Sequence, residues 1–242
     1  MLTRLPRLVL ELLGYELRRP PAPFEIPDIP DRHLYRPVYS PWEGEKAFMR
    51  YYRLAEPRTL VSPDRCYVLY RLLLQALQVE GDVWECGVYR GGTAALMAAV
   101  MADERSAKKL HLFDSFEGMP DVDAGRDLHA KGDFARTSAE SVAGYVGHPE
   151  RVVMRRGMMP ATFAGLEDAR IALAHIDVDL YRSVKDCLAF VWPRVSPGGF
   201  VILDDYGFPS CPGARQATDE FFSGTPHVPL CLPTGQAIVF RS

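Results

Sequence analysis

Short apolar runs alternate with segments of helical periodicity from residue 82 to the end of the chain. The runs predict strands at residues 83–86, 110–113, 151–154, 171–176, 200–203, 228–231 and 236–240. The segments between them predict helices at residues 93–101, 138–146, 181–192 and 213–223. Because strands alternate with helices, we expect a doubly wound α/β fold, with a mostly parallel seven-stranded sheet and helices on both faces.

The first 62 residues have a different pattern, and we expect them to form an N-terminal extension before an α/β domain at residues 63–242. Residues 2–17 carry leucines on one helical face, which predicts a packing or dimer-forming helix rather than a membrane-surface helix. The run is too short for a transmembrane helix, which needs about 20 apolar residues, and Glu11 interrupts it. Seven prolines at residues 19–42 predict an extended, lid-like arm.

Two helices are expected between the arm and the first strand. They cover residues 43–55 and 63–79, and the second has Pro63 in its first turn and Ser62 as a plausible N-cap. Both would precede the sheet as a helical elaboration of the α/β domain.

Charge and cysteine content narrow the choice of partners and compartment. The formal net charge is −3, and no basic tract with interleaved aromatic residues is present, so nucleic acid is not an expected partner. The five cysteines have neither zinc-knuckle nor C-x-x-C spacing, which favours free thiols in a reducing cytoplasm.

A glycine-rich turn follows the first strand, in the segment ECGVYRGG from Glu85 to Gly92. Gly87 and Gly91 would let the backbone turn tightly and approach a ligand closely. The segment is neither a G-x-G-x-x-G fingerprint nor a P-loop. The carboxylate of Glu85 suits a ligand with a positive amino group, which favours S-adenosylmethionine over a dinucleotide. The alternative is a turn whose glycines serve packing alone.

Asp114 ends the second strand, where a carboxylate can accept hydrogen bonds from both hydroxyls of a ribose. The alternative is a turn or N-cap aspartate, because Asp114 and Ser115 also form a favourable turn pair. Together with Glu85, this position favours a nucleoside ligand.

Three further aspartates follow two strands: Asp177 comes after residues 171–176, and Asp204 and Asp205 come after residues 200–203. Neighbouring parallel strands lie about 4.8 Å apart, so these carboxylates should share one edge of the sheet. Clustered carboxylates repel one another unless a cation neutralises them. Oxygen ligands without a nearby histidine and cysteine set favour magnesium over zinc. The alternative is that Asp204 and Asp205 cap the exit of a strand.

Asp179 stands two residues after Asp177. If the strand continues, its side chain should turn away from the cluster, and we expect a helix cap or an ion-pair partner there.

Four motifs occur in order: ECGVYRGG, HLFDSFEGMP, HIDVDLYRSV and SPGGFVILDDYG. With the upstream segment RTLVSPDRCYVLYRLL, they resemble the macrocin O-methyltransferase (TylF-like) family over roughly residues 45–222. The resemblance implies a Rossmann-like class I methyltransferase fold, S-adenosylmethionine as donor with S-adenosylhomocysteine as product, and Mg²⁺ held by Asp177, Asp204 and Asp205.

The resemblance also implies donor-site residues. Glu85 and Gly87 would hold the methionine end, Asp114 and Ser115 the ribose, and Thr59 would lie near the donor. Gly157 and Met158 stand where family members usually carry a tryptophan after the glycine. The full set expected at the donor is Thr59, Glu85, Gly87, Tyr89, Gly91, Asp114, Ser115, Gly157, Met158 and Asp177.

Methyl transfer to a hydroxyl needs a base as well as the metal. Asp177 could act through its second oxygen, and His129, in a loop at residues 119–137 that should shape the acceptor pocket, is the other candidate. We expect an acceptor with vicinal hydroxyls, most simply a sugar of a glycosylated natural product or glycan, and a possible homodimer. The alternatives are a catechol-type O-methyltransferase, a nicotinamide-dependent dehydrogenase and a non-enzymatic scaffold.

Overall fold

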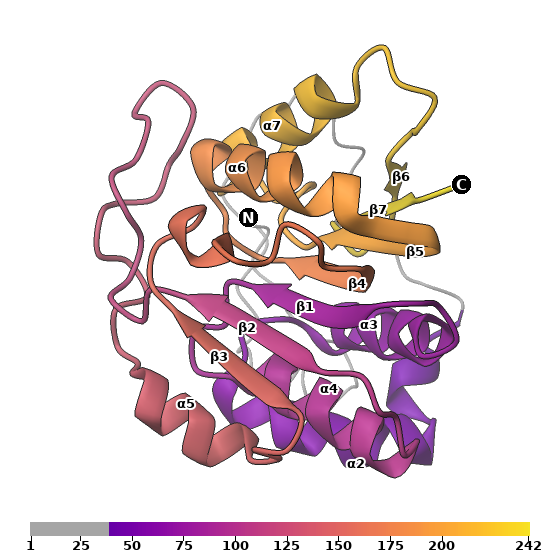
Figure 1. Cartoon of the computed structure of the whole chain (residues 1–242). Coiled ribbons are helices and arrows are strands. Elements are labelled where there is room, and N and C mark those ends of the chain that lie inside the picture. Colours follow the sequence, from indigo (N-terminus) through magenta and orange to yellow (C-terminus); the bar gives the residue numbers. More distant parts are fainter. Residues whose placement is uncertain (1–38) are drawn as a thin grey trace, which may run out of the picture. The chain divides into compact units, whose positions relative to one another are not determined.

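The computed structural model describes residues 39–242, which hold a seven-stranded sheet in the order β3-β2-β1-β4-β5-β7-β6 (Figure 1). Neighbouring strands run parallel except where β7 pairs with β5 and β6. The strands are β1 (Asp82–Cys86), β2 (Leu110–Asp114), β3 (Val152–Arg156), β4 (Ile171–Ile176), β5 (Val195–Leu203), β6 (Leu230–Cys231) and β7 (Ala237–Phe240). The mostly parallel, doubly wound α/β sheet predicted from the sequence is confirmed.

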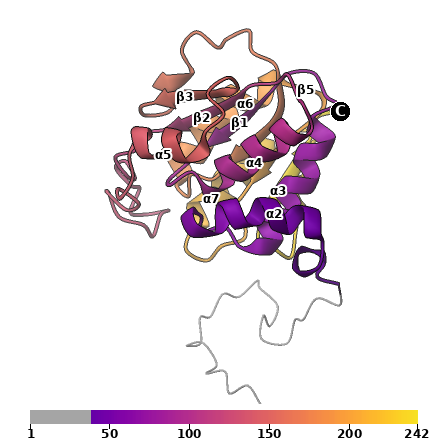
Figure 2. The same cartoon turned by 90° about the horizontal axis from the view of Figure 1, so that it is seen from below.

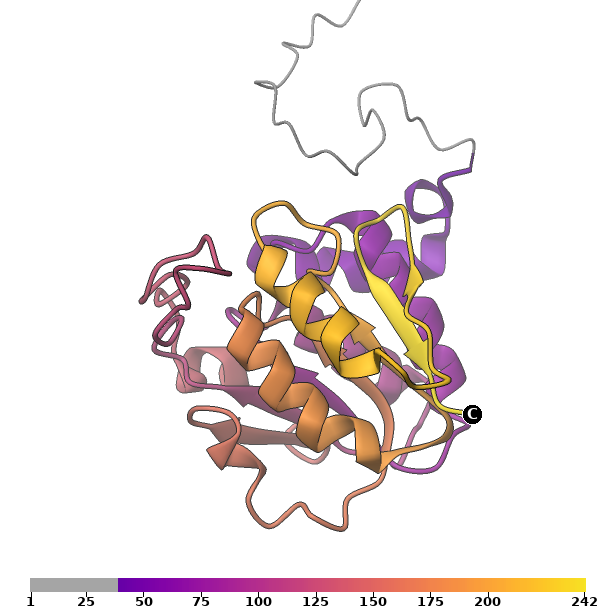
Figure 3. The same ribbon diagram turned by 90° about the horizontal axis from the view of Figure 1, so that it is seen from above.

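Helices cover both faces of this sheet. They are α2 (Lys46–Ala55), α3 (Pro63–Ala76), α4 (Gly92–Asp103), α5 (Ala139–Val146), α6 (Tyr181–Val191) and α7 (Pro212–Phe222). Helices α2 to α5 lie on the face seen in Figure 2, and α6 and α7 lie together on the face seen in Figure 3. None of the helices within residues 39–242 is long and apolar enough to cross a bilayer.

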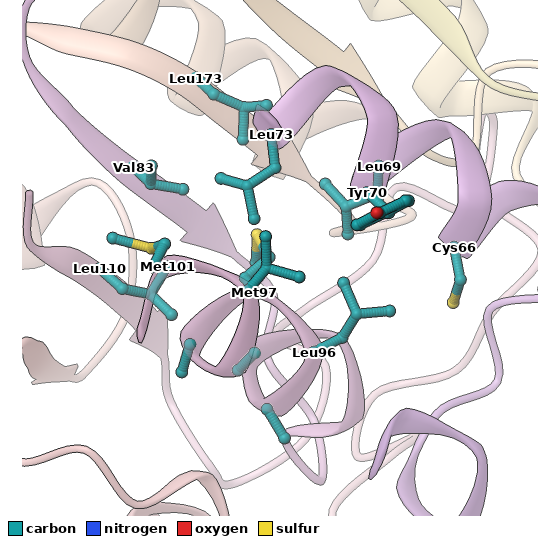
Figure 4. Packing of buried hydrophobic residues seen from close by; sticks show 14 of the residues in the cluster. Cys66, Leu69, Tyr70, Leu73, Val83, Leu96, Met97, Met101, Leu110 and Leu173 are labelled. Carbon is teal, nitrogen blue, oxygen red and sulfur yellow. The ribbon is translucent and has the colours of Figure 1, made fainter. Parts of the chain in front are cut away.

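Two apolar clusters fill the space between the sheet and the helices. Successive strand residues point to opposite faces, so Val83 enters the cluster beneath α3 and α4 while Trp84 enters the one beneath α6. The strands are therefore apolar on both faces, as in other parallel sheets. Figure 4 shows part of the first cluster, where the helices meet the strands: Leu69, Leu73, Leu96, Met97, Met101, Val83, Leu110 and Leu173.

The connection order creates a crevice at the carboxyl ends of the strands. The chain winds from β1 outward through β2 to β3, then returns to β4 on the other side of β1. Loops from β1 and β4 therefore leave in opposite directions, which is where open α/β sheets bind ligands. The long loop between β2 and α5 stands out at this end of the strands in Figure 1.

Two local expectations differ from the structure. Ser62 precedes α3, but its hydroxyl caps no backbone N–H of the helix and instead accepts a hydrogen bond from Arg65 Nε at 3.1 Å. Strand β5 begins at Val195, before the strand predicted at residues 200–203.

The helix expected at residues 2–17 and nearly all of the proline-rich arm lie outside the described residues. Within them, α2 packs on α4 and brings Phe48 into the first apolar cluster. The division of the chain after residue 62 stays a prediction.

Candidate active site

A cleft of about 430 Å³ opens at the carboxyl ends of β1, β2, β4 and β5. Its volume falls within the range of sites for small molecules and cofactors. Ten of the residues predicted to bind the donor or the metal, or to act as the base, lie along it: Thr59, Gly87, Tyr89, Asp114, Ser115, His129, Gly157, Met158, Asp177 and Asp205. Three other predicted site residues do not line the cleft, and each has a different role: Glu85, Gly91 and Asp204.

Gly87 brings the end of β1 against the end of β4. Its φ is +87°, and a Cβ built on it would lie 1.7 Å from the backbone oxygen of Asp177. Any side chain here would force the two strand ends apart, so the glycine is needed for close backbone approach. Gly91, with φ +82°, caps α4 and packs against Val142, which aims the start of the helix at the cleft.

Asp114 holds the glycine turn in place. Its Oδ2 accepts the N–H groups of Val88 and Tyr89, each at 2.8 Å, and its Oδ1 accepts the N–H of Phe116 at 2.7 Å. The turn role considered as an alternative is therefore present. Asp114 also lines the cleft, so a ribose contact stays a prediction.

Glu85 lies beneath the cleft in a buried chain of charged side chains. Its Oε1 lies 3.2 Å from His175 Nδ1, and His175 Nε2 lies 3.3 Å from Oδ1 of Asp204. Asp204 also accepts hydrogen bonds from Arg65 and, at 2.7 Å, from Gln236. These side chains meet because Glu85 pairs with His175 in the parallel register and both point to the face covered by α3.

Charge pairing decides the protonation of these buried side chains. Burial by itself would lower the pKa of His175, but its hydrogen bonds and charge interactions with Asp204 and Glu85 raise the pKa to about 10. Burial opposes ionisation of Asp204, yet the hydrogen bond from His175 and the charges of His175 and Arg65 hold its pKa below its usual range. Two carboxylates thus face two cations in a buried, nearly neutral group.

A second group of carboxylates faces the cleft. One oxygen each of Asp177, Asp179 and Asp205 lies within 4.8 Å of the others. Burial and the neighbouring Asp204 raise the pKa of Asp177 well above its ordinary value, and burial with Asp177 and Asp179 does the same for Asp205. This repulsion between protein charges is the condition that a bound cation relieves.

The expectation that Asp179 turns away from this group is wrong. Strand β4 ends at Ile176, so the two-residue alternation stops before Asp179. Asp179 has a φ of +55°, and its N–H donates to Oδ2 of Asp205 at 3.0 Å. The left-handed backbone turns its carboxylate back toward Asp177.

Asp204 and Asp205 both follow the end of β5 at Leu203, but their side chains lie in different surroundings. Asp205 faces the cleft, whereas Asp204 is fully buried with Arg65, His175 and Gln236. An oxygen of Asp204 still lies within 4.8 Å of ligand atoms of His175 and Asp177. Its predicted metal role therefore stays a prediction that requires exchange of its present partners.

His129 comes from the long loop and reaches the carboxylates. Its Nε2 lies 3.7 Å from Asp179 Oδ1 and 3.6 Å from Cys211 Sγ. The expectation that no histidine and cysteine lie near the carboxylates is wrong. The sequence did not reveal this pair, because His129 and Cys211 are 82 residues apart along the chain and only the tertiary fold brings them together.

Residues 65–225 match the sequence model of the family described as Macrocin-O-methyltransferase (TylF). The chain belongs to this family. Among curated relatives, it is 37% identical over 157 residues to "8-demethyl-8-(2,3-dimethoxy-alpha-L-rhamnosyl)-tetracenomycin-C 4'-O-methyltransferase" of Streptomyces olivaceus, covering 59% of this chain and 58% of that protein. It is 34% identical over 155 residues to "Demethyldecarbamoylnovobiocin O-methyltransferase" of Streptomyces niveus, covering 59% and 58%.

A solved structure, that of the O-methyltransferase NovP, superposes with a TM-score of 0.70 at 28% identity, over 76% of this chain and 82% of that one. The class I methyltransferase fold implied by the family resemblance is thereby confirmed. The chain spans 58% of the length of the two curated relatives named above.

Proposed function

We propose that this TylF-family chain is an S-adenosylmethionine-dependent O-methyltransferase that methylates a sugar hydroxyl of a glycosylated small molecule with the help of Mg²⁺. The observation that carries the proposal is one cleft shared by the glycine turn after β1, the carboxylate of Asp114 and the group Asp177, Asp179 and Asp205. The residues proposed to bind the methyl donor and those proposed to bind the metal and the acceptor thus line the same cleft. Support for the sugar comes from the relative named for a rhamnosyl-bearing substrate.

The donor fits the glycine-turn side of the cleft. Gly87 leaves the backbone bare where a Cβ would collide, and α4 begins beside it. Oδ1 of Asp114 accepts one hydrogen bond and keeps a lone pair for a ribose hydroxyl. Thr59 lies against the start of α4. Glu85 keeps one buried oxygen, Oε2, without a hydrogen-bond partner among the described residues, which suits an amino group or a bridging water.

Magnesium fits the carboxylate group. Three acidic side chains converge at the cleft, and hard oxygen ligands are those that Mg²⁺ prefers. Asp177 and Asp205 would hold the ion, with either Asp179 or the predicted Asp204 as the third ligand. When bound there, the ion supplies Lewis acidity that orients the acceptor hydroxyls and lowers their pKa.

The base must take the proton of the attacking hydroxyl. The second oxygen of Asp177 and the side chain of His129 were the predicted acceptors, and the fold adds Asp179 near both. His129 is itself held by Asp133, whose Oδ2 lies 3.4 Å from Nδ1, so its Nε2 points toward Asp179. His129→Ala should lower the maximal rate and leave donor binding unchanged; full turnover in that variant would exclude it as the base.

Calorimetry with S-adenosylmethionine and S-adenosylhomocysteine tests the donor, first with Mg²⁺ and then with EDTA. Turnover assays with glycosylated and catechol acceptors then test the acceptor class. Micromolar binding and Mg²⁺-dependent methylation of a sugar are the expected results. Binding of neither nucleoside would refute the methyltransferase proposal, and turnover of catechols alone would replace the sugar with a phenolic diol.

The third metal ligand needs its own comparison. Asp179→Asn and Asp204→Asn should differ in the Mg²⁺ concentration for half-maximal activity, because only a true ligand changes metal affinity strongly. Binding of Mn²⁺ as a paramagnetic probe reports the same difference without turnover.

A further inference from the structure

We propose that Cys211, His129 and Asp179 form a zinc-binding site on the wall of the cleft, separate in its ligand chemistry from the proposed magnesium site. The three come from the start of α7, the long loop after β2 and the turn after β4. All three line the cleft, so an ion can reach them from solvent.

The ligand atoms already have the spacing of a tetrahedral zinc centre. Zinc bonds of about 2.3 Å to sulfur and about 2.0–2.1 Å to nitrogen or oxygen, at tetrahedral angles, put sulfur about 3.5 Å from each partner and nitrogen about 3.3 Å from oxygen. The observed separations are 3.6 Å for Cys211 Sγ to His129 Nε2, 3.3 Å for Cys211 Sγ to Asp179 Oδ1, and 3.7 Å for His129 Nε2 to Asp179 Oδ1. Shifts of a few tenths of an ångström would complete the site.

The surroundings of the ligands resemble the outer shell of zinc sites. Asp133 Oδ2 lies 3.4 Å from the other ring nitrogen of His129, the position from which a carboxylate orients a zinc-bound imidazole. The N–H of Asp179 is held by Asp205, which keeps the Asp179 carboxylate in place. Cys211 precedes α7 as its N-cap residue, but burial and the carboxylates of Asp205 and Asp179 raise the pKa of its thiol, so a cation that binds here must displace the thiol proton.

Thiolate and imidazole ligands select zinc over magnesium. Cys211 is 3% exposed, and its thiol now donates a hydrogen bond to Asp179. Binding breaks the S–H bond, forms an S–Zn bond and releases the proton to the buffer, with no change in oxidation state. Three protein ligands leave the fourth position open to the cleft for water or an acceptor hydroxyl.

The two metal sites compete for Asp179. A zinc ion on Cys211 and His129 would draw this carboxylate from the proposed magnesium group and occupy the predicted base. Inhibition of methyl transfer by zinc is the functional consequence, and it rests on the proposed function, whereas metal binding stands on the ligand geometry alone.

Binding is tested on the full chain, purified without metal under anaerobic conditions, with Co²⁺ as a spectroscopic probe and Zn²⁺ as competitor. The wild-type protein should bind one Co²⁺ with a thiolate-to-cobalt charge-transfer band and tetrahedral ligand-field bands, and one equivalent of Zn²⁺ should remove both. Loss of an outer-shell partner typically weakens metal binding by ~10–100-fold, and the loss of zinc affinity in Asp133→Asn should lie in that range. Cys211→Ser and His129→Gln remove ligands and should weaken zinc binding by more than that.

Cys231→Ser is the matched control, because Cys231 is the exposed cysteine and should leave the charge-transfer band unchanged. His129 lies in a loop, so its variant tests the site even if Cys211→Ser alters folding. Absence of the band in the wild-type protein, or a band that survives Cys211→Ser and disappears in Cys231→Ser, would overturn the proposal. Because these readouts require neither donor nor acceptor, they are independent of any failure of the methyltransferase proposal.

Discussion

Replacing His175 with glutamine should strongly destabilise the fold, because this imidazole joins two buried carboxylates. Glu85 and Asp204 lie on either side of it, and all three side chains are fully buried. With Arg65 the group balances two negative and two positive charges, so His175→Gln leaves one buried negative charge uncompensated. Breaking a buried ion pair from one side costs about 3–5 kcal/mol.

The pKa of His175 leads to a similar magnitude. Hydrogen bonds and charges from Asp204 and Glu85 overcome burial and raise it from 6.5 to about 10. At about 1.4 kcal/mol per unit, the imidazolium contributes at most about 5 kcal/mol. Because the folded pKa lies above the unfolded one, this stabilisation is complete below about pH 6.5 and is lost as the pH rises toward 10.

Urea unfolding of the metal-free protein between pH 7 and pH 9 measures this effect. The wild-type free energy of unfolding should fall by about 1.4 kcal/mol per pH unit more than that of His175→Gln, or about 3 kcal/mol over the window. Taking the difference between the two proteins cancels the titration of cysteines and other shared groups. His111→Gln is the matched control, since His111 pairs with the half-exposed Asp82 at the other end of the sheet.

Two outcomes would refute this reasoning. One is a loss below about 1 kcal/mol for His175→Gln at pH 7, and the other is an equal pH slope in both proteins. Either would mean that His175 is neutral in the folded state.

Three further predictions concern the cleft. Gly87→Ala should abolish binding of S-adenosylhomocysteine in calorimetry, because its Cβ would collide with the Asp177 backbone; unchanged affinity would contradict the close approach. Asp114→Asn places an amide opposite the backbone N–H groups of the glycine turn, at a cost of about 1–3 kcal/mol. This variant should bind S-adenosylhomocysteine about 10–100-fold more weakly. An affinity equal to that of the wild-type protein would count against Asp114 as the organiser of the turn. Asp205→Asn should lower the rate of methyl transfer by at least about 100-fold at saturating donor. It should also raise the thermal stability of the metal-free protein, because the carboxylate that its neighbours repel is gone. A variant that keeps Mg²⁺-dependent turnover would exclude Asp205 as a metal ligand.

Local pattern determined the fold class of this protein. Strands of the central sheet are short apolar runs because both faces of a parallel sheet are buried, and strand β4 was predicted with its observed bounds, Ile171–Ile176. Glycine and aspartate at strand ends also stood out, because these residue types are favoured where the backbone turns toward a ligand. The four motifs then led to the TylF family, which the comparison confirms.

The side on which each charged residue lies was decided by the tertiary structure. The strand register pairs Glu85 with His175 beneath the cleft, and its contact with the donor stays a prediction. His175 drew no attention in the sequence, because its role depends on two carboxylates 90 and 29 residues away. Its position in an otherwise apolar, fully buried strand could have raised the question, since a histidine at a core position needs partners.

The ends of strands were harder to predict than their middles. Asp179 was expected to alternate away from Asp177, but β4 stops at Ile176 and the left-handed residue that follows reverses the direction of its side chain. His129 and Cys211 likewise meet only because a loop and the start of a helix, 82 residues apart, close over one strand edge. Periodicity is a property of near neighbours and determines the elements, whereas contacts between distant residues depend on packing and register, and these arise only when the whole chain is folded.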